Sequence, residues 1–171
     1  MPQASERFLG LQLWLNIPSE YKMKAEPAYH GVLNQDIQEF PIQGGKLRLL
    51  AGNYENHSGI QGKYLPLDFY DIFLDKGEET TIKCSGEDKS IMLFTLVGDA
   101  IISGKEVKEK TAVKLGKGDE ITIQERDKAI EIVYIASRRL EEEVAWHGPI
   151  VMNTRQELIE AFEDIENNTF I

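Results

Sequence analysis

The stretch SIMLFTLVGDAIISG, residues 90–104, decides how the rest of the sequence is interpreted. SIMLFTLVG is strongly apolar and favours a strand, and DAIISG continues as a second apolar segment. Gly98 lies between the two segments, and glycine is the residue expected where a chain bends or bulges between strands. The stretch therefore predicts two successive strands with a turn or bulge at Gly98.

Short apolar segments separated by glycine turns continue on both sides of this stretch. Period-two alternation, which places every second side chain on one face, predicts a strand at residues 10–18 that ends at Pro18. Residues 19–31 and 53–63 are polar or glycine-rich and predict loops. Many short strands at regular spacing are typical of an antiparallel sandwich or barrel. Further strands are predicted within residues 44–52, 67–77, 80–84, 112–124 and 128–137.

One helix is predicted, at about residues 154–166. Thr154 can cap its first turn, and Glu157, three residues later, completes a capping box. Because an apolar stripe at helical spacing must be buried, we expect one face of the helix to pack against other residues. The stripe consists of Leu158, Ile159, Ala161, Phe162 and Ile165.

The composition favours a single domain over residues 1–171, rich in strands from residue 9 to residue 152. Lys and Arg number 19 and Asp and Glu number 29, so the net charge is −10. This acidic balance argues against nucleic acid or anionic membranes as partners. Cys84, the one cysteine, has no partner for an internal disulfide and is expected to be a buried thiol. The N-terminus lacks the plan of a signal peptide and no apolar run could span a bilayer, so we expect a cytoplasmic protein.

Two stretches, GLQLWLNIPSEYKMKAEPAY at residues 10–29 and GPIVMNTRQELIEAF at residues 148–162, resemble the C-terminal half of the pirin family. Residues 47–77 resemble the strands and the loop of that half. Residues 137–149 depart from it, because pirins usually have a Gly-Gly-x-Pro-Leu-like turn there. The resemblance implies an all-β cupin, a double-stranded β-helix or jelly-roll barrel, with one C-terminal α-helix.

Pirins are two-domain cupins, and in the family the metal lies in the N-terminal cupin, held by three histidines and a glutamate. The resemblance therefore implies that this metal-binding half, with its His-x-His strand, is absent from the sequence. Iron or another divalent metal belongs to the family's other cupin, and no cofactor is expected in this chain.

The cupin metal pattern can be placed on residues 77–98, from one glycine to another. Its ligand positions then fall on Lys83, Ser85 and Lys89, with Ser90 as an alternative to Lys89. Lysines at ligand positions would repel a cation. We therefore predict a degenerate site without metal and no catalytic residue. The three histidines, His30, His57 and His147, are far apart in the sequence and each lies in a loop or near a turn; whether folding gathers them stays open.

Other patterns point to structure more than to chemistry. GKGD, residues 116–119, lies between two strands and favours a hairpin turn over a phosphate loop. Asp68, Asp71 and Asp75 are interpreted as the solvated edge of a sheet. The interior of the barrel could hold a small apolar ligand, although core packing is the more ordinary role for its side chains. The candidate lining residues are Phe69, Tyr70, Phe73, Phe94 and Tyr134.

Three functions follow from these observations. The leading hypothesis is a metal-free structural or interaction domain. The second is half of a pirin of the quercetin 2,3-dioxygenase kind, active only with an N-terminal metal-binding cupin supplied in trans. The third is a small-molecule-binding barrel. We expect self-association, or pairing with a separate N-terminal pirin cupin, because a chain without that cupin would leave an apolar face uncovered. The expected anchors are Leu158, Ile159, Phe162 and Ile165.

Overall fold

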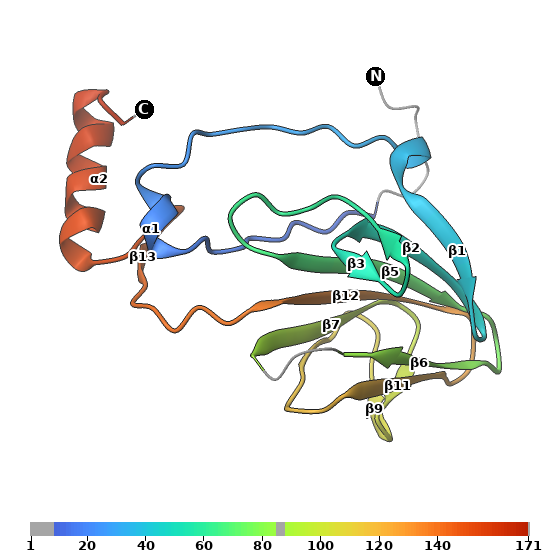
Figure 1. Cartoon of the computed structure of the whole chain (residues 1–171). Coiled ribbons are helices and arrows are strands. Elements are labelled where there is room, and N and C mark those ends of the chain that lie inside the picture. The colour runs from blue at the N-terminus through green and yellow to red at the C-terminus, as the bar shows by residue number, and fades with distance from the viewer. Residues whose placement is uncertain (1–8, 85–87, 171) are drawn as a thin grey trace. The chain divides into compact units, whose positions relative to one another are not determined.

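The computed structural model describes residues 9–84 and 88–170. Between residues 38 and 138, the regular secondary structure of the described residues consists of strands that pair in antiparallel sheets (Figure 1). Within these residues, no helix combines the length and the apolar composition needed to cross a lipid bilayer. In chain order the elements are α1 (Ser19–Lys22), the 3-10 helix η1 (Asn34–Asp36), β1 (Gln38–Ile42), β2 (Gly45–Ala51), β3 (Asn53–Tyr54), β4 (His57–Ser58), β5 (Leu67–Leu74), β6 (Glu79–Lys83), β7 (Lys89–Val97), β8 (Ala100–Ile102), β9 (Lys105–Val107), β10 (Ala112–Lys114), β11 (Glu120–Glu125), β12 (Ile130–Arg138), β13 (Ala145–His147), β14 (Ile150–Met152) and α2 (Arg155–Asn167).

The chain is divided into two compact units. Residues 26–141 form the sheet unit, which contains β1 to β12. The described residues of 1–25 and 142–171 together form the terminal unit, which contains α1, the β13–β14 pair and α2. The single domain expected over residues 1–171 stays a prediction, which the number of unfolding transitions would test.

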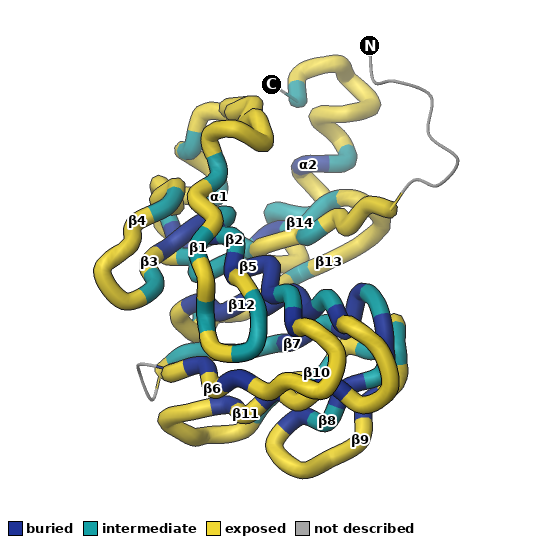
Figure 2. Tube along the Cα trace, turned by 90° about the vertical axis from the view of Figure 1, so that its right-hand side faces the viewer, coloured by how far each residue is buried: buried dark blue, intermediate teal, exposed yellow. Residues whose placement is uncertain are grey.

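Two antiparallel sheets surround the core of the sheet unit, which also contains the short β3–β4 pair. Strands β1-β2-β5-β12-β7-β10 form a six-stranded sheet, and β6-β11-β8-β9 form a four-stranded one. Alternate residues of both sheets meet in a shared hydrophobic core. Figure 2 shows buried residues in dark blue along these strands. Burying each large aliphatic side chain contributes roughly 1.5–3 kcal/mol. Leu47, Ile72, Leu93, Ile123 and Ile132 are fully buried in this core.

Most predicted strands are confirmed, but the pairing of β5 corrects one interpretation. Strand β5 lies between β2 and β12, so it is a central strand and not an edge. The prediction that Asp68, Asp71 and Asp75 mark a solvated edge is therefore wrong. Asp71 is buried, because its side chain projects from the middle of the six-stranded sheet.

The strand predicted at residues 10–18 is wrong, because residues 9–18 have no regular secondary structure. Alternation describes which side chains share a face, but a strand also needs a neighbour to complete its hydrogen bonds. Strand β1, which no pattern predicted, shows the converse. It contains Pro41 and pairs only with β2, and an edge strand tolerates a residue that cannot donate to a ladder.

The GKGD segment connects two sheets. Strand β10 pairs with β7 in the six-stranded sheet, whereas β11 pairs with β6 and β8 in the four-stranded sheet. Residues 115–119 therefore carry the chain from one sheet to the other, and the predicted hairpin turn is wrong. Glycine spacing indicates a turn but does not indicate whether the flanking strands pair with each other.

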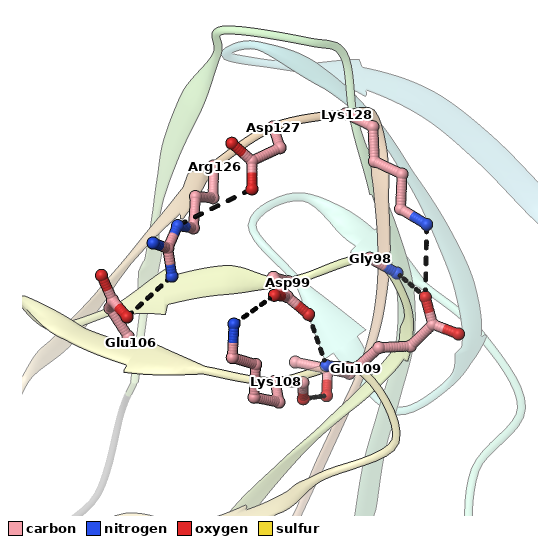
Figure 3. Close-up of polar contacts among 9 residues, drawn as sticks. Gly98, Asp99, Glu106, Lys108, Glu109, Arg126, Asp127 and Lys128 are labelled. Atoms are coloured by element: carbon pink, nitrogen blue, oxygen red, sulfur yellow. Dashed lines mark hydrogen bonds and ion pairs between the residues drawn. The ribbon is translucent and has the colours of Figure 1, made fainter.

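A bend at Gly98 joins β7 to β8, as predicted. Gly98 has φ +81°, and an added Cβ would lie 2.7 Å from Ile130 Cγ2. Figure 3 shows how polar contacts fix this bend: Glu109 accepts from the Gly98 N–H at 2.8 Å, and Asp99 accepts from Lys108 Nζ at 2.7 Å and from the Glu109 N–H at 3.0 Å. The Lys108 hydrogen bond lowers the pKa of the Asp99 carboxyl.

The terminal unit is a small hairpin with a helix packed on it. Strands β13 and β14 pair through Trp146↔Val151, with Gly148 at φ +57° in the turn. The Thr154 hydroxyl accepts from the Glu157 N–H at 3.1 Å, and Glu157 reaches back to the Thr154 N–H. The predicted capping box and the helix at about 154–166 are thereby confirmed. The Ser19 N–H donates to Glu142 Oε2 at 2.7 Å, which ties the first segment of this unit to the second.

Candidate functional site

The sheet unit contains a cavity of about 290 Å³, which we call the tyrosine cavity. Side chains from β3, β5, β6, β7 and β12 converge on it, so it is formed by both sheets. Three of its eight residues are tyrosines, and two are lysines. The residues that line it are Asn53, Tyr54, Glu55, Asp68, Tyr70, Lys83, Lys89 and Tyr134.

Stacked aromatic rings form one wall of the tyrosine cavity. Tyr70 and Tyr134 face each other across β5 and β12, with ring centroids 4.8 Å apart and planes within 5°. Tyr54 meets the edge of Tyr70 at 5.5 Å. The Tyr70 hydroxyl donates to the Asn53 carbonyl oxygen, so this wall is held in place from two directions.

Burial controls the protonation of the groups around this wall. It raises the pKa of Tyr70, with Asp68 acting in the same direction, and it raises the pKa of Tyr134, with Cys84 adding to the effect. Burial also raises the pKa of the Cys84 thiol, against the opposing effects of its hydrogen bond with Tyr134 and the charge of Lys89. The hydroxyls therefore remain protonated donors at neutral pH, and Cys84 is a buried thiol, as predicted, without reactive thiolate character.

The structure brings two of the three predicted ligand positions together. Lys83 at the end of β6 and Lys89 at the start of β7 both line the tyrosine cavity. Lys89 Nζ is 2.6 Å from Asp68 Oδ2, so its charge is already paired. Ser85, the third predicted position, lies outside the described residues.

The chemistry of this donor set does not fit a divalent metal. A cation entering the cavity would meet two lysine ammonium groups, and one of its two carboxylates, Asp68, is already bound to Lys89. Within residues 9–84 and 88–170, no group of three His, Cys, Asp or Glu side chains is placed to hold a metal ion.

Of the five residues proposed to line a barrel interior, Tyr70 and Tyr134 line the tyrosine cavity. Phe69, Phe73 and Phe94 do not line the cavity, because successive side chains of a strand point to opposite faces and these three alternate with core residues. Sequence reasoning missed Asn53, Tyr54, Glu55 and Asp68. Asp68 could have been found, since it shares its face of β5 with Tyr70. The segment at residues 53–63, predicted to be a loop, instead contains the short strands β3 and β4, and no pattern in it indicates where it folds.

The described structure does not gather the three histidines. His57 stacks on Phe40, with centroids 4.0 Å apart, and its Nδ1 is 3.3 Å from Gln38 Oε1. His147 meets the edge of Phe162 at 5.6 Å, and His30 lies exposed in a loop. His30 and His57 belong to the sheet unit, whereas His147 belongs to the terminal unit.

The terminal unit carries an exposed apolar surface, which we call the Trp146 surface. It consists of Trp146 and the two grooves that share this side chain, with volumes of about 670 and 660 Å³. Trp146 is 72% exposed, Trp14 is 63% exposed and Val144 is 54% exposed. Large side chains of this kind are rarely left in water together unless they bind something.

Three of the four predicted anchors belong to this surface. Leu158, Ile159 and Phe162 of α2 line the first groove, opposite β13. Ile165 is exposed but lines neither groove. Sequence reasoning passed over Trp146 and Trp14, although an exposed tryptophan beside a Gly-Pro turn is the signal that could have drawn attention to the hairpin.

A buried ion pair lies elsewhere in the sheet unit. Asp71 Oδ2 accepts from Arg48 at 3.1 Å, and Arg48 also donates to Asn34 Oδ1 at 2.6 Å. Asp71 Oδ1 is buried without a hydrogen-bond partner among the described residues. Burial raises the pKa of the Asp71 carboxyl to about 6, with Glu131 acting in the same direction and Arg48 opposing.

This raised pKa predicts that the Asp71 contribution to stability falls as pH rises. The ordinary pKa of the carboxyl is 3.8, so between about pH 4 and 6 the folded state binds the proton more tightly than the unfolded state. The contribution is complete below about pH 4 and is lost as pH rises through 6. Asp71→Asn should remove this dependence, which amounts to about 1–2 kcal/mol once solvent screening is allowed for. Urea unfolding of both proteins at pH 4, 5, 6 and 7 measures the difference.

Asp99→Asn is the control, because the contribution of Asp99 to stability should change with pH in the opposite direction to that of Asp71. Because the pKa of Asp99 is lowered, its contribution is present above the unfolded pKa and is lost as pH falls. A wild-type minus Asp71→Asn difference that is flat from pH 4 to pH 7, or that grows with pH, contradicts the prediction.

Comparison with known proteins identifies the family. Residues 69–171, more than half of the chain, match the profile of the pirin C-terminal cupin domain. The chain belongs to this family. The predicted resemblance to pirins is confirmed, and so is the predicted cupin fold class with its C-terminal helix.

This pirin C-terminal domain has relatives among pirins of several organisms. It is 32% identical to human pirin over 176 residues, which covers 98% of the chain and 59% of human pirin. It is 31% identical to a pirin-like protein of Caulobacter vibrioides over 177 residues, which covers 99% of the chain and 62% of that protein.

The fold is also similar to that of a solved structure. The crystal structure of quercetin 2,3-dioxygenase from Acinetobacter baumannii superimposes with a TM-score of 0.84 at 28% identity, over 92% of this chain and 55% of that one. The pirin C-terminal domain described here thus spans less than two thirds of the length of the relatives it matches.

Proposed function

We propose that this chain is a metal-free, non-catalytic interaction domain whose Trp146 surface binds an N-terminal, metal-containing pirin cupin. The observation that carries the proposal is the exposure of Trp146 between two apolar grooves. Tryptophan is the residue most enriched among those that dominate the binding energy of protein interfaces.

The geometry of Trp146 supports binding because the ring is already fixed. Its indole N–H donates to the Gly148 carbonyl oxygen at 2.6 Å, within the β13–β14 turn. A fixed ring loses little conformational freedom when it is covered, and preorganisation of this kind favours association. Burial of the two grooves would contribute roughly 25 cal/mol for each Å² of apolar surface removed from water.

The lengths of the relatives support the choice of an N-terminal cupin as the partner in this proposal. The matched relatives are longer than this chain by a segment large enough for another domain. In a pirin the second domain is an N-terminal cupin, and that cupin is the occupant we propose, whether it is linked to this chain or separate from it.

Charge argues against a second copy of the chain as the occupant. Exposed Glu160, Glu163, Asp164 and Glu166 on α2 face solvent, with Arg155 as the one basic residue of the helix. A symmetric dimer would bring two such acidic helices toward one interface, where like charges repel. A partner with Lys or Arg around an apolar patch would be complementary.

A polar group in the second groove adds a point of specificity. Lys22 lines this groove, and its Nζ is buried without a hydrogen-bond partner among the described residues. A buried donor left unpaired is costly, so a carbonyl or carboxylate of the partner would stabilise the complex by accepting from it.

A second candidate function follows from the Acinetobacter baumannii relative, whose name states quercetin 2,3-dioxygenase activity. On this hypothesis the complex oxidises quercetin, and the chemistry takes place at the metal of the N-terminal cupin. The cavity lysines of the present chain make it unsuited to supply that metal site itself. Quercetin consumption by the complex, but not by the chain alone, would distinguish this function from binding alone.

The proposal is tested by purifying the chain with and without an N-terminal pirin cupin encoded in the same genome. Sedimentation velocity should show a monomeric chain that forms a one-to-one complex when the cupin is added. A chain that dimerises by itself, or one that stays separate from the cupin at tens of micromolar concentration, overturns the proposal.

A further inference from the structure

We propose that the tyrosine cavity is a binding site for a small planar organic carboxylate, with Lys83 and Tyr54 as the donors that receive it. The inference does not depend on the proposed interaction function, because the cavity and the Trp146 surface belong to different units of the chain.

Lys83 places a positive charge in the cavity that has no partner of its own. Both cavity lysines stand at positions where the cupin pattern places metal ligands, but their situations differ. Lys89 is paired with Asp68 at 2.6 Å, whereas no carboxylate among the described residues forms an ion pair with Lys83. An unpaired ammonium group thus lies at a position where the cupin pattern places a metal ligand, and a carboxylate is the complementary ligand.

Tyr54 provides a second unused donor. Its hydroxyl has no hydrogen-bond partner among the described residues, in contrast to the hydroxyl of Tyr70, which is bonded to Asn53. Burial raises the pKa of Tyr54, with Glu55 adding to the effect, so the hydroxyl is a neutral donor at physiological pH. An ammonium group and a hydroxyl on one cavity can share the two oxygens of a carboxylate.

The aromatic wall and the volume define the rest of the ligand. The stacked rings of Tyr70 and Tyr134 both line the cavity, and a flat apolar group could pack against them. A volume of about 290 Å³ holds roughly ten non-hydrogen atoms at the density of a liquid. An aromatic monocarboxylate such as benzoate fits both requirements.

Benzoate is the probe, and benzamide and benzylamine are its neutral and cationic counterparts. Saturation-transfer NMR with the whole chain should show benzoate bound with a Kd on the order of 1 mM, as expected for so small a ligand. Benzamide should bind more weakly and benzylamine should not bind. Equal binding of all three compounds, or preference for benzylamine, overturns the proposal.

Substitutions separate this site from others on the surface. Lys83 is an exposed residue at a strand end, so Lys83→Met should fold normally, and it should weaken benzoate binding about tenfold through loss of a charge-assisted hydrogen bond. Glu55→Gln should strengthen binding, because it removes a negative charge from the cavity rim. Lys114→Met, an exposed strand lysine that does not line the cavity, should leave binding unchanged. If the Lys83→Met and Lys114→Met variants bind benzoate with the same Kd, benzoate does not bind at Lys83 and the proposed site is wrong.

Discussion

Trp146→Ser is expected to weaken binding of the N-terminal cupin by about 30-fold or more, the loss typical of an interface residue worth at least 2 kcal/mol. The reason is that Trp146 belongs to both grooves of the Trp146 surface, so its removal reduces both at once. Isothermal titration of the chain with the cupin measures the change in Kd. The melting temperature should hardly change, because the ring is 72% exposed.

Tyr29→Ser is the matched control for this experiment. Tyr29 is 92% exposed and lines neither groove. The substitution therefore removes an exposed aromatic ring from outside the Trp146 surface. It should bind the cupin as the wild type does. If both substitutions weaken binding equally, the loss reflects general apolar area and the Trp146 surface is not the interface. Phe162 is a poorer probe, since its ring contacts His147 and its loss would disturb the unit itself.

Gly45→Ala is expected to destabilise the sheet unit by at least about 3 kcal/mol, at the upper end for overpacking. Gly45 lies between Ile42 of β1 and Leu74 of β5 in the six-stranded sheet. An added Cβ would lie 1.9 Å from the Phe73 carbonyl oxygen and 3.0 Å from Leu74 Cα. Both atoms are backbone, so no rotamer change can relieve the contact and the strands must separate. Urea unfolding followed by tyrosine fluorescence and by circular dichroism measures the free energy.

Gly116→Ala gives the comparison for that substitution. No atom lies within 4 Å of a Cβ built on Gly116, so its unfolding free energy should stay within about 0.5 kcal/mol of the wild type. Gly45→Ala would contradict the expected result if it unfolded at the same urea concentration as Gly116→Ala. The same curves show whether the chain unfolds in one transition, as expected for a single domain, or in two.

The sequence predicted the parts of the fold that depend on local pattern. The capped helix was found because Thr154 and Glu157 form a motif with a defined geometry. The central strands were found because their buried positions alternate, as Ile130, Ile132 and Tyr134 do. The segment at residues 10–18 shows the limit, since the same alternation there is not matched by a neighbouring strand.

The sites were harder to predict because they depend on which segments meet. Nothing in the order of residues places Tyr54 of the short strand β3 beside Tyr70 of β5. Lys83 and Lys89 could be assigned to the same region only through the spacing of the cupin pattern, and the structure brings them to one cavity. The proposed role of Trp146 rests on its exposure, which a sequence does not record.

The terminal unit is formed by two segments that are far apart in the sequence, so the two units of the chain can fold only in a certain order during synthesis. Residues 26–141 are continuous, so every strand of the sheet unit has been synthesised before residues 142–170 are added. The first segment must wait, since the hydrogen bond from Ser19 to Glu142 joins residues 123 positions apart. Until then Trp14 and its apolar neighbours have no hairpin to pack against, and a nascent chain in this state is a natural substrate for a chaperone.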